Sequence, residues 1–271
     1  MTDFKNPWAK GGKYYPNWIE ETKRKVLDTS KLFGNEDESN SSQTTKSKYR
    51  VLLFGGVDYF NEGAYGTNKQ LAQYIETIAL SSKYKIPLQK GDIQVVNSPL
   101  FSNEVDGKDV YKEILEIVKK NFDYNNGTLI LYGYSWGGQL LMEFLKFFKQ
   151  SGIKISLLLS VDAAKGYFSF AVNNDVTNNV KYNLNLYQTN FLAGLFWSRG
   201  GPNEGNKVKN VDLTGEKNPK GEDVVHSNID EYTLIYSAQV IIYALKNIYT
   251  FYDYSEAEIK SQIKTYASQG Y

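Results

Sequence analysis

The chain has 271 residues, enough for one large domain or two small ones with a packed core. Its 31 Lys and Arg residues nearly balance 30 Asp and Glu residues, so no single-sign field points to a nucleic-acid partner. The absence of cysteine excludes disulfides and thiolate metal sites, and no apolar run is long enough to span a membrane.

The N-terminal part differs in composition from the rest of the chain. Residues 1–34 mix aromatic and charged side chains, and we expect an N-terminal extension of unknown role there. Residues 35–48 form a polar, low-complexity run, which predicts a flexible linker. Together, residues 1–48 are a candidate surface for a protein partner. The first residues lack the apolar stretch of a signal peptide, so we expect a cytoplasmic protein or one exported by a non-classical route.

From residue 49 to 271 the pattern alternates between short apolar runs and segments with helical spacing. We predict strands over 49–54, 93–97, 128–134, 155–161, 182–189 and 208–213. We predict helices over 67–82, over 108–121, directly after the 128–134 strand, and over 230–248. This alternation is typical of a doubly wound α/β fold with a mostly parallel sheet of about six strands.

A serine stands where the strand over 128–134 meets the next helix, in the sequence GYSWGG. Gly133 and Gly137 leave room at a sharp turn that would hold the Ser135 hydroxyl above the sheet. A Gly/Ser turn without chemistry is the alternative, since short patterns of this kind also occur by chance. The strand–helix context favours Ser135 as a nucleophile.

A serine hydroxyl needs a base to take its proton, and His226 is the only histidine of the chain. It follows the last predicted strand and precedes a long helix, so it could reach over the ends of the strands. A histidine without a special role is the common alternative. If imidazole activates Ser135, His226 must supply it.

The histidine in turn needs a carboxylate to orient it, and four aspartates are candidates. Asp162 ends the strand that follows the nucleophile strand, so its side chain is expected at the same sheet edge as Ser135. A turn or cap residue is the alternative interpretation of Asp162. Asp212, Asp223 and Asp230 are the other candidates. We prefer Asp162 because it gives the hydrolase order Ser, Asp, His along the chain.

An oxyanion hole would complete such a site. The backbone N–H of Trp136 is the first expected donor, and the loop after the first strand supplies the second, from Gly56 or Val57. That loop does not fit a phosphate-binding pattern. No metal ligand set and no cofactor are expected.

These segments together resemble the α/β-hydrolase superfamily, in particular its lipase- and esterase-like members. The resemblance spans about residues 48–250 and rests on GYSWGG, VLLFGG, SVDAAKG and VVHSNID. It implies a minimal α/β-hydrolase fold, since no strand is evident before residue 49. An acid directly after the strand that follows the nucleophile strand is similar to the arrangement in pancreatic-type lipases. In most members of the superfamily the acid comes one strand later, which here is around Thr189 and Asn190, where the chain has no carboxylate.

The substrate is less well indicated. Residues 163–207 form an apolar insert whose large side chains could be a lid or acyl-chain wall, or could pack on the sheet. These side chains are Tyr167, Phe168, Phe170, Phe191, Leu192, Leu195, Phe196 and Trp197. They favour a lipid or acyl-ester substrate. The alternatives are a toxin-type effector with a neutralising partner and a catalytically inactive binding scaffold.

Overall fold

The computed structural model describes residues 46–56, 63–96, 108–164, 173–190 and 200–270. By its internal contacts the chain divides into Met1–Thr44 and Thr45–Tyr271, and every described residue belongs to the second unit. The extension expected over 1–34 and most of the polar run over 35–48 lie outside the described residues. Ser47 is part of the fold: it is 3% exposed, and its backbone bridges Phe122.

The described residues form one six-stranded sheet in the order β2-β1-β3-β4-β5-β6, and all strand pairs are parallel. The strands are β1 (Tyr49–Phe54), β2 (Ile93–Val96), β3 (Thr128–Tyr134), β4 (Leu157–Val161), β5 (Asn183–Tyr187) and β6 (Val208–Asp212). The central strands β1, β3 and β4 are mostly apolar and buried along almost their whole length, because both of their faces are covered. The expected doubly wound α/β class and minimal α/β-hydrolase fold are confirmed.

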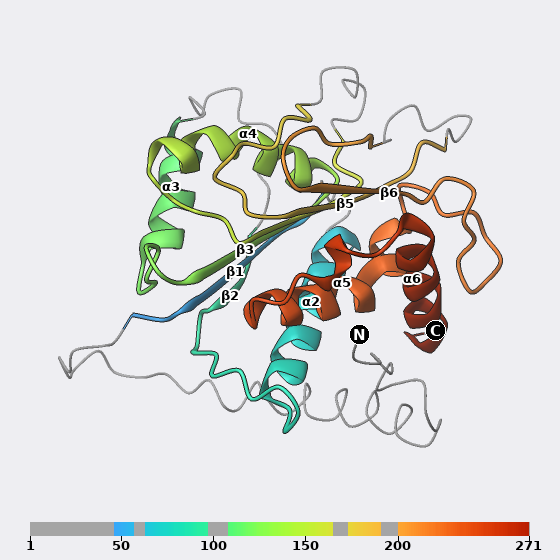
Figure 1. The fold of residues 1–271 in the computed structure, drawn as a ribbon, viewed down its shortest axis with the longest axis horizontal. Coiled ribbons are helices and arrows are strands. Elements are labelled where there is room, and N and C mark those ends of the chain that lie inside the picture. Colours follow the sequence, from blue (N-terminus) through green and yellow to red (C-terminus); the bar gives the residue numbers. More distant parts are fainter. Residues whose placement is uncertain (1–45, 57–62, 97–107, 165–172, 191–199, 271) are drawn as a thin grey trace. The chain divides into compact units, whose positions relative to one another are not determined.

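Helices cover both faces of the sheet, as Figure 1 shows. They are α2 (Gly63–Leu80), α3 (Lys108–Lys119), α4 (Trp136–Gln150), α5 (Ile229–Leu245) and α6 (Glu256–Gly270), with a short 3₁₀ turn at Thr250–Tyr252. Helices α3 and α4 lie on one face, and α2, α5 and α6 lie on the other (Figure 1). Helix α5 is buried on nearly all sides because it packs between α2, α6 and the sheet.

Helix α6 was not among the sequence-based expectations. It buries Ile259, Ile263, Tyr266 and Ala267, which recur at helical spacing and face α5. Its other positions are mostly charged or polar, so the helix is amphipathic and shields the apolar surface of α5 from water.

A polar row crosses the last three strands. Ser160 of β4, Asn185 of β5 and Asn210 of β6 are in register. The Ser160 hydroxyl lies 3.0 Å from Asn185 Oδ1, and Asn185 Nδ2 donates to Asn210 Oδ1 at 2.8 Å. Two further amides pair with the row: Asn203 Nδ2 donates to Ser160 Oγ and to Asn183 Oδ1, both at 3.0 Å. Hydrogen bonding thus compensates the cost of burying these groups.

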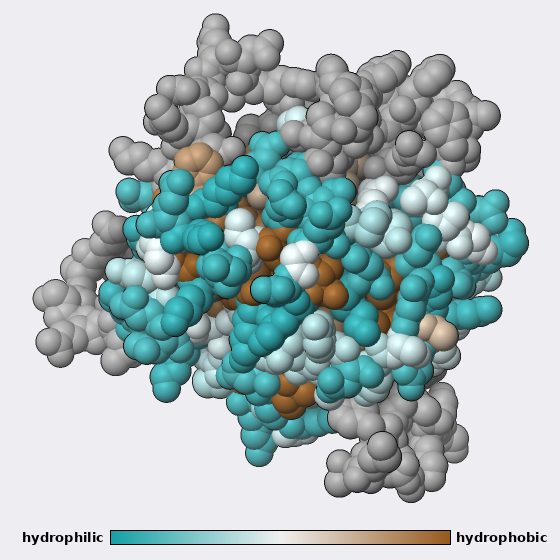
Figure 2. Space-filling view, turned by 45° about the horizontal axis from the view of Figure 1, so that its top comes forward, coloured by the Kyte–Doolittle hydropathy of each residue, from teal (hydrophilic) through white to brown (hydrophobic). Residues whose placement is uncertain are grey.

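The described part of the face shown in Figure 2 is predominantly hydrophilic. In the face shown in Figure 2, hydrophobic residues appear as small areas between polar side chains. Large apolar side chains that are exposed in the described residues include Leu80, Ile248 and Tyr252. No helix in the described part of the chain has the length and apolar character needed to cross a bilayer.

Candidate active site

Ser135 lies at the junction of β3 and α4 in an unusual backbone conformation. Its φ is 55° and its ψ is −125°, a region that non-glycine residues rarely occupy and that stores strain. A Cβ at Gly133 would come within 2.6 Å of Gly138 Cα, and one at Gly137 within 2.4 Å of the Gly55 carbonyl oxygen. The flanking glycines are therefore needed for the close packing of strand, helix and loop around the serine.

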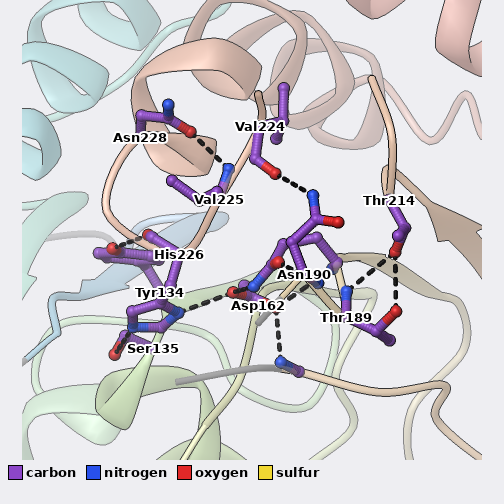
Figure 3. Close-up of polar contacts among 12 residues, drawn as sticks. Tyr134, Ser135, Asp162, Thr189, Asn190, Thr214, Val224, Val225, His226 and Asn228 are labelled. Atoms are coloured by element: carbon purple, nitrogen blue, oxygen red, sulfur yellow. Dashed lines mark hydrogen bonds and ion pairs between the residues drawn. The ribbon is translucent and has the colours of Figure 1, made fainter. Parts of the chain in front are cut away.

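The histidine loop brings its ring onto this serine. His226 Nε2 lies 2.7 Å from Ser135 Oγ, as Figure 3 shows. Tyr134 holds the histidine from two directions: its ring stacks on the imidazole at 5.3 Å, and its hydroxyl donates to the His226 carbonyl. Burial, reinforced by the charges of Asp230 and Asp162, raises the pKa of Tyr134 well above its usual range. The phenol therefore stays protonated and keeps donating.

Asp162 follows β4 and carries the carboxylate that faces the other side of the imidazole. Its Oδ2 lies 2.7 Å from His226 Nδ1, and the residue is fully buried. Its φ of 44° makes it a second strained residue at this edge of the sheet. Three more donors reach the carboxylate: Gln188 Nε2 at 2.8 Å, the Gln188 N–H at 3.2 Å and the Gly200 N–H at 2.7 Å. These bonds replace the water that burial removes.

Gln188 and Asn190, which follow β5, connect the aspartate to the histidine loop. Gln188 Oε1 accepts from the Asn190 N–H at 2.7 Å, so its Nε2 must point toward Asp162. Asn190 Nδ2 donates to the Val224 carbonyl at 2.7 Å, two residues before His226 (Figure 3). Sequence reasoning noted only that this strand end lacks a carboxylate; it missed that amides there could support an acid on the neighbouring strand.

Gly200 closes the remaining side of the carboxylate. A Cβ there would lie 2.5 Å from Asp162 Oδ1, so only glycine lets its backbone N–H approach. The next residues are anchored by the polar row: Asn185 Nδ2 donates to the Gly201 carbonyl at 2.8 Å, and the Asn203 N–H donates to Asn210 Oδ1 at 2.8 Å. The packing of β5 and β6 thus fixes a hydrogen bond to Asp162.

The other three candidate aspartates have different partners. Asp212 accepts from the backbone and side chain of Thr214, and Asp223 pairs with Lys217 at 2.8 Å on the surface. Among the carboxylates of the described residues, the one with an oxygen at hydrogen-bond distance from the His226 ring is Asp162.

Asp230 is a second buried carboxylate near the site. It is 4% exposed and lies in the first turn of α5. Burial raises the pKa of Asp230 from its ordinary value near 3.8 to about 6, although a hydrogen bond from Thr67 opposes the rise. The charge of Asp230 also acts on Tyr132 and Tyr134, in the strand that leads to the nucleophile.

The residues expected to form an oxyanion hole are partly described. Trp136 is the first residue of α4, directly after Ser135. Gly56 lies against the serine, because a Cβ on it would be 3.3 Å from Ser135 Oγ. Val57 lies outside the described residues, as do the eight large apolar side chains of the insert over 163–207.

The arrangement can perform general-base catalysis. An imidazole that accepts from a serine hydroxyl and donates to a buried carboxylate can move a proton off the serine as the oxygen attacks an electrophile. The described residues contain no group of three or more His, Cys, Asp or Glu side chains placed to hold a metal ion.

No family model matches the sequence, and no curated protein matches it. Solved structures with a similar fold include an arylesterase, with 12% identity, a TM-score of 0.43 and coverage of 87% of this chain and 95% of that chain. Phospholipase PlaB from Legionella pneumophila has 12% identity and a TM-score of 0.44; the match covers 80% of this chain but only 63% of the phospholipase, less than two thirds. An esterase from Pyrobaculum calidifontis has 10% identity, a TM-score of 0.41 and coverage of 92% and 93%. Such low TM-scores carry no conclusion about activity.

Proposed function

We propose that this chain is a serine hydrolase that cleaves carboxylic esters, with Ser135 as nucleophile, His226 as general base and Asp162 as the acid that orients the histidine. The observation that carries the proposal is the unbroken chain of two 2.7 Å contacts from Ser135 Oγ through the imidazole to Asp162 Oδ2. The strained backbone at Ser135 and Asp162 adds support, because strain of this kind clusters at functional sites.

In the first half of the reaction, Ser135 Oγ attacks the ester carbonyl carbon while its proton passes to His226 Nε2. The carbonyl oxygen becomes an oxyanion, which the Trp136 N–H and a donor from Gly56 or Val57 would stabilise. The Asp162 carboxylate stabilises the imidazolium and keeps its Nδ1 proton in place. When the intermediate collapses, the C–O bond to the alcohol breaks and the leaving oxygen takes the proton from Nε2.

The second half repeats the same steps with water. The neutral imidazole removes a proton from a water molecule, whose oxygen attacks the acyl carbon bound to Ser135. Collapse of the second intermediate returns the proton to Ser135 Oγ and releases the carboxylic acid. Atoms and charges balance without a cofactor.

For the substrate, we propose a lipid or long-chain acyl ester. The support is the set of large aromatic and aliphatic side chains within 163–207 and the indole of Trp136 next to the nucleophile. A thioester of a long acyl chain would satisfy the same features. A series of nitrophenyl esters of increasing chain length tests the point: kcat/KM should rise with chain length, and a maximum at acetate would refute the lipid assignment.

The central experiment is labelling of the full chain with a fluorophosphonate probe. Wild type should label once, at Ser135, and Ser135→Ala should not label while Ser268→Ala, on the exposed surface of α6, labels normally. His226→Ala should lose turnover almost as completely as Ser135→Ala, by about 10⁶-fold, because the two residues act as a unit. Labelling that persists in Ser135→Ala, or a folded wild type that neither labels nor hydrolyses esters, would overturn the proposal; the latter result would indicate an inactive scaffold.

A further inference from the structure

The opposite end of the sheet holds a cavity of about 670 Å³. Its walls are the segments that lead into β3, β4, β5 and β6, namely residues 124–127, 152–156, 178–181 and 206–207, with Lys149 from the last turn of α4. Because the strands are parallel, these segments meet at their amino ends, whereas Ser135 and Asp162 follow the carboxyl ends of β3 and β4. The cavity is therefore separate from the proposed active site.

The lining is cationic, although the chain as a whole is almost neutral. Lys149, Lys154, Lys181 and Lys207 reach it from four different segments, and none of its lining residues is Asp or Glu. None of these four lysines pairs with a carboxylate of the described residues. Four ammonium groups around one hollow raise the local potential and attract anions.

Two of these lysines are held in place without being neutralised. Tyr182 and Tyr249 stack at 4.3 Å, and the Lys181 ammonium lies 4.8 Å from the centre of the Tyr249 ring. The Lys207 ammonium lies 5.1 Å from the centre of the Tyr182 ring. Cation–π contacts of this kind fix a lysine while leaving its full charge and its N–H donors available to a ligand.

A second group of cations borders the cavity at Tyr124. The ammonium groups of Lys46 and Lys119 lie 5.8 and 5.9 Å from the centre of its ring. The acidic residues that directly precede lining segments in the sequence are Asp123 and Glu204, and neither lines the cavity. The carboxylate of Asp123 already accepts from the backbone and side chain of Asn126.

We propose that this cavity binds a small anion carrying two or more phosphate groups. Amide side chains from Asn125, Asn178 and Asn206 add neutral donors to the lysines in the lining, a combination that suits phosphate oxygens. The volume lies in the range of small-molecule sites and exceeds the need of one phosphate. Both free polyphosphates and diphosphorylated lipid headgroups carry this chemistry.

The test is isothermal titration of the full-length chain with sodium tripolyphosphate. Lys181→Gln/Lys207→Gln should weaken binding at least about tenfold relative to wild type. The matched control is Lys83→Gln/Lys246→Gln, which removes two lysines that lie over Tyr84 outside the cavity and makes the same change in net charge. The control should change affinity by no more than about twofold.

Protection of the lysines from chemical modification tests the same proposal on the wild-type protein. Tripolyphosphate should protect Lys181 and Lys207, but not Lys83, from acetylation by a water-soluble acylating reagent, as read by mass spectrometry. Cosedimentation with phosphatidylcholine vesicles, with or without cardiolipin, identifies the source: binding to cardiolipin vesicles alone would assign a lipid headgroup. Binding to neither probe, an equal loss in the control variant, or equal acetylation of Lys181 and Lys207 with and without the probe that binds would overturn the proposal.

Discussion

Two buried aspartates act on Tyr134, and the protein surrounds them in different ways. Asp162 is fully buried at the end of β4, and its two oxygens meet four donors from His226, Gln188 and Gly200. Asp230 is almost as buried in the first turn of α5, yet loss of solvation dominates there and raises its pKa to about 6.

The difference teaches that burial alone does not prepare a carboxylate for catalysis. A buried anion is stable only where donors replace its water, and the segments after β5 supply those donors to Asp162. Asp230 has a helix N-terminus, which favours negative charge, and hydrogen bonds from Thr67 and from backbone N–H groups, but loss of solvation outweighs them. We therefore expect substitutions at Asp162 to change the rate, and substitutions at Asp230 to change stability.

Among the substitutions that test this comparison of the two aspartates, the largest effect is expected from Asp162→Asn. The amide keeps the shape but favours the wrong imidazole tautomer, and the same change lowers the rate of a serine protease by about 10⁴-fold. Turnover of a nitrophenyl ester measures the loss. Asp223→Asn is the control, because that residue pairs with Lys217 on the surface. If Asp162→Asn keeps nearly full turnover while Asp223→Asn or Asp212→Asn loses it, the acid is wrongly assigned.

Gln188→Glu should give a smaller effect that depends on pH. While it is protonated, the introduced carboxyl group could still donate to Asp162, but its ionisation would place two negative charges side by side in a buried site. Relative to wild type at the same pH, the variant should lose about 10–100-fold in activity as the introduced carboxyl group ionises, the scale seen when an outer partner of a metal ligand is mutated.

The control for this prediction is Gln94→Glu, at the start of the edge strand β2, where the amide donates to the Gly91 carbonyl. It should leave the pH profile unchanged. A Gln188→Glu profile with the wild-type shape, merely scaled down, would mean that Gln188 contributes only to packing.

The smallest effect on rate is expected from Asp230→Asn, which should instead stabilise the fold. Because the folded-state pKa of Asp230 is raised, the folded chain holds this proton more tightly than the unfolded chain. Stability from this group is therefore lost as pH rises from about 4 to about 6, by up to about 3 kcal/mol. Urea unfolding should show that Asp230→Asn is more stable than wild type at neutral pH and that the difference shrinks near pH 4. A variant that is less stable than wild type at both pH values would contradict this.

Much of the fold could be predicted because its signals are local. Apolar runs marked the central strands, and mixed or alternating apolar and polar residues marked β2, β5 and β6, all within a few residues; β1 and β3 coincide with their predicted ranges. Helix α6 was missed because its few apolar residues lie among charged and polar ones. Their helical spacing can be interpreted as a buried face only when the position of α5, on which they pack, is known.

The site residues could be predicted where a reactive residue type occurs at a recognisable position in the chain, such as the end of a strand. Ser135 stood out by its glycines, His226 by being the only histidine, and Asp162 by ending a strand, and the structure brings these three side chains together. Gln188 and Gly200 were not found, because amides and glycines have no catalytic signature. Their bonds to Asp162 span 26 and 38 residues of sequence, so they depend on the pairing of strands.

The row of Ser160, Asn185 and Asn210 has a consequence for how the sheet selects one pairing. A shift of β5 by a single residue would turn Asn185 to the opposite face and break its hydrogen bonds to Ser160 on β4 and Asn210 on β6. Purely aliphatic strands would tolerate such a slip more easily. The row therefore makes sheets with the wrong strand register less stable during folding. A chain with valine at all three positions should form more misfolded, aggregation-prone species even if its native packing were preserved.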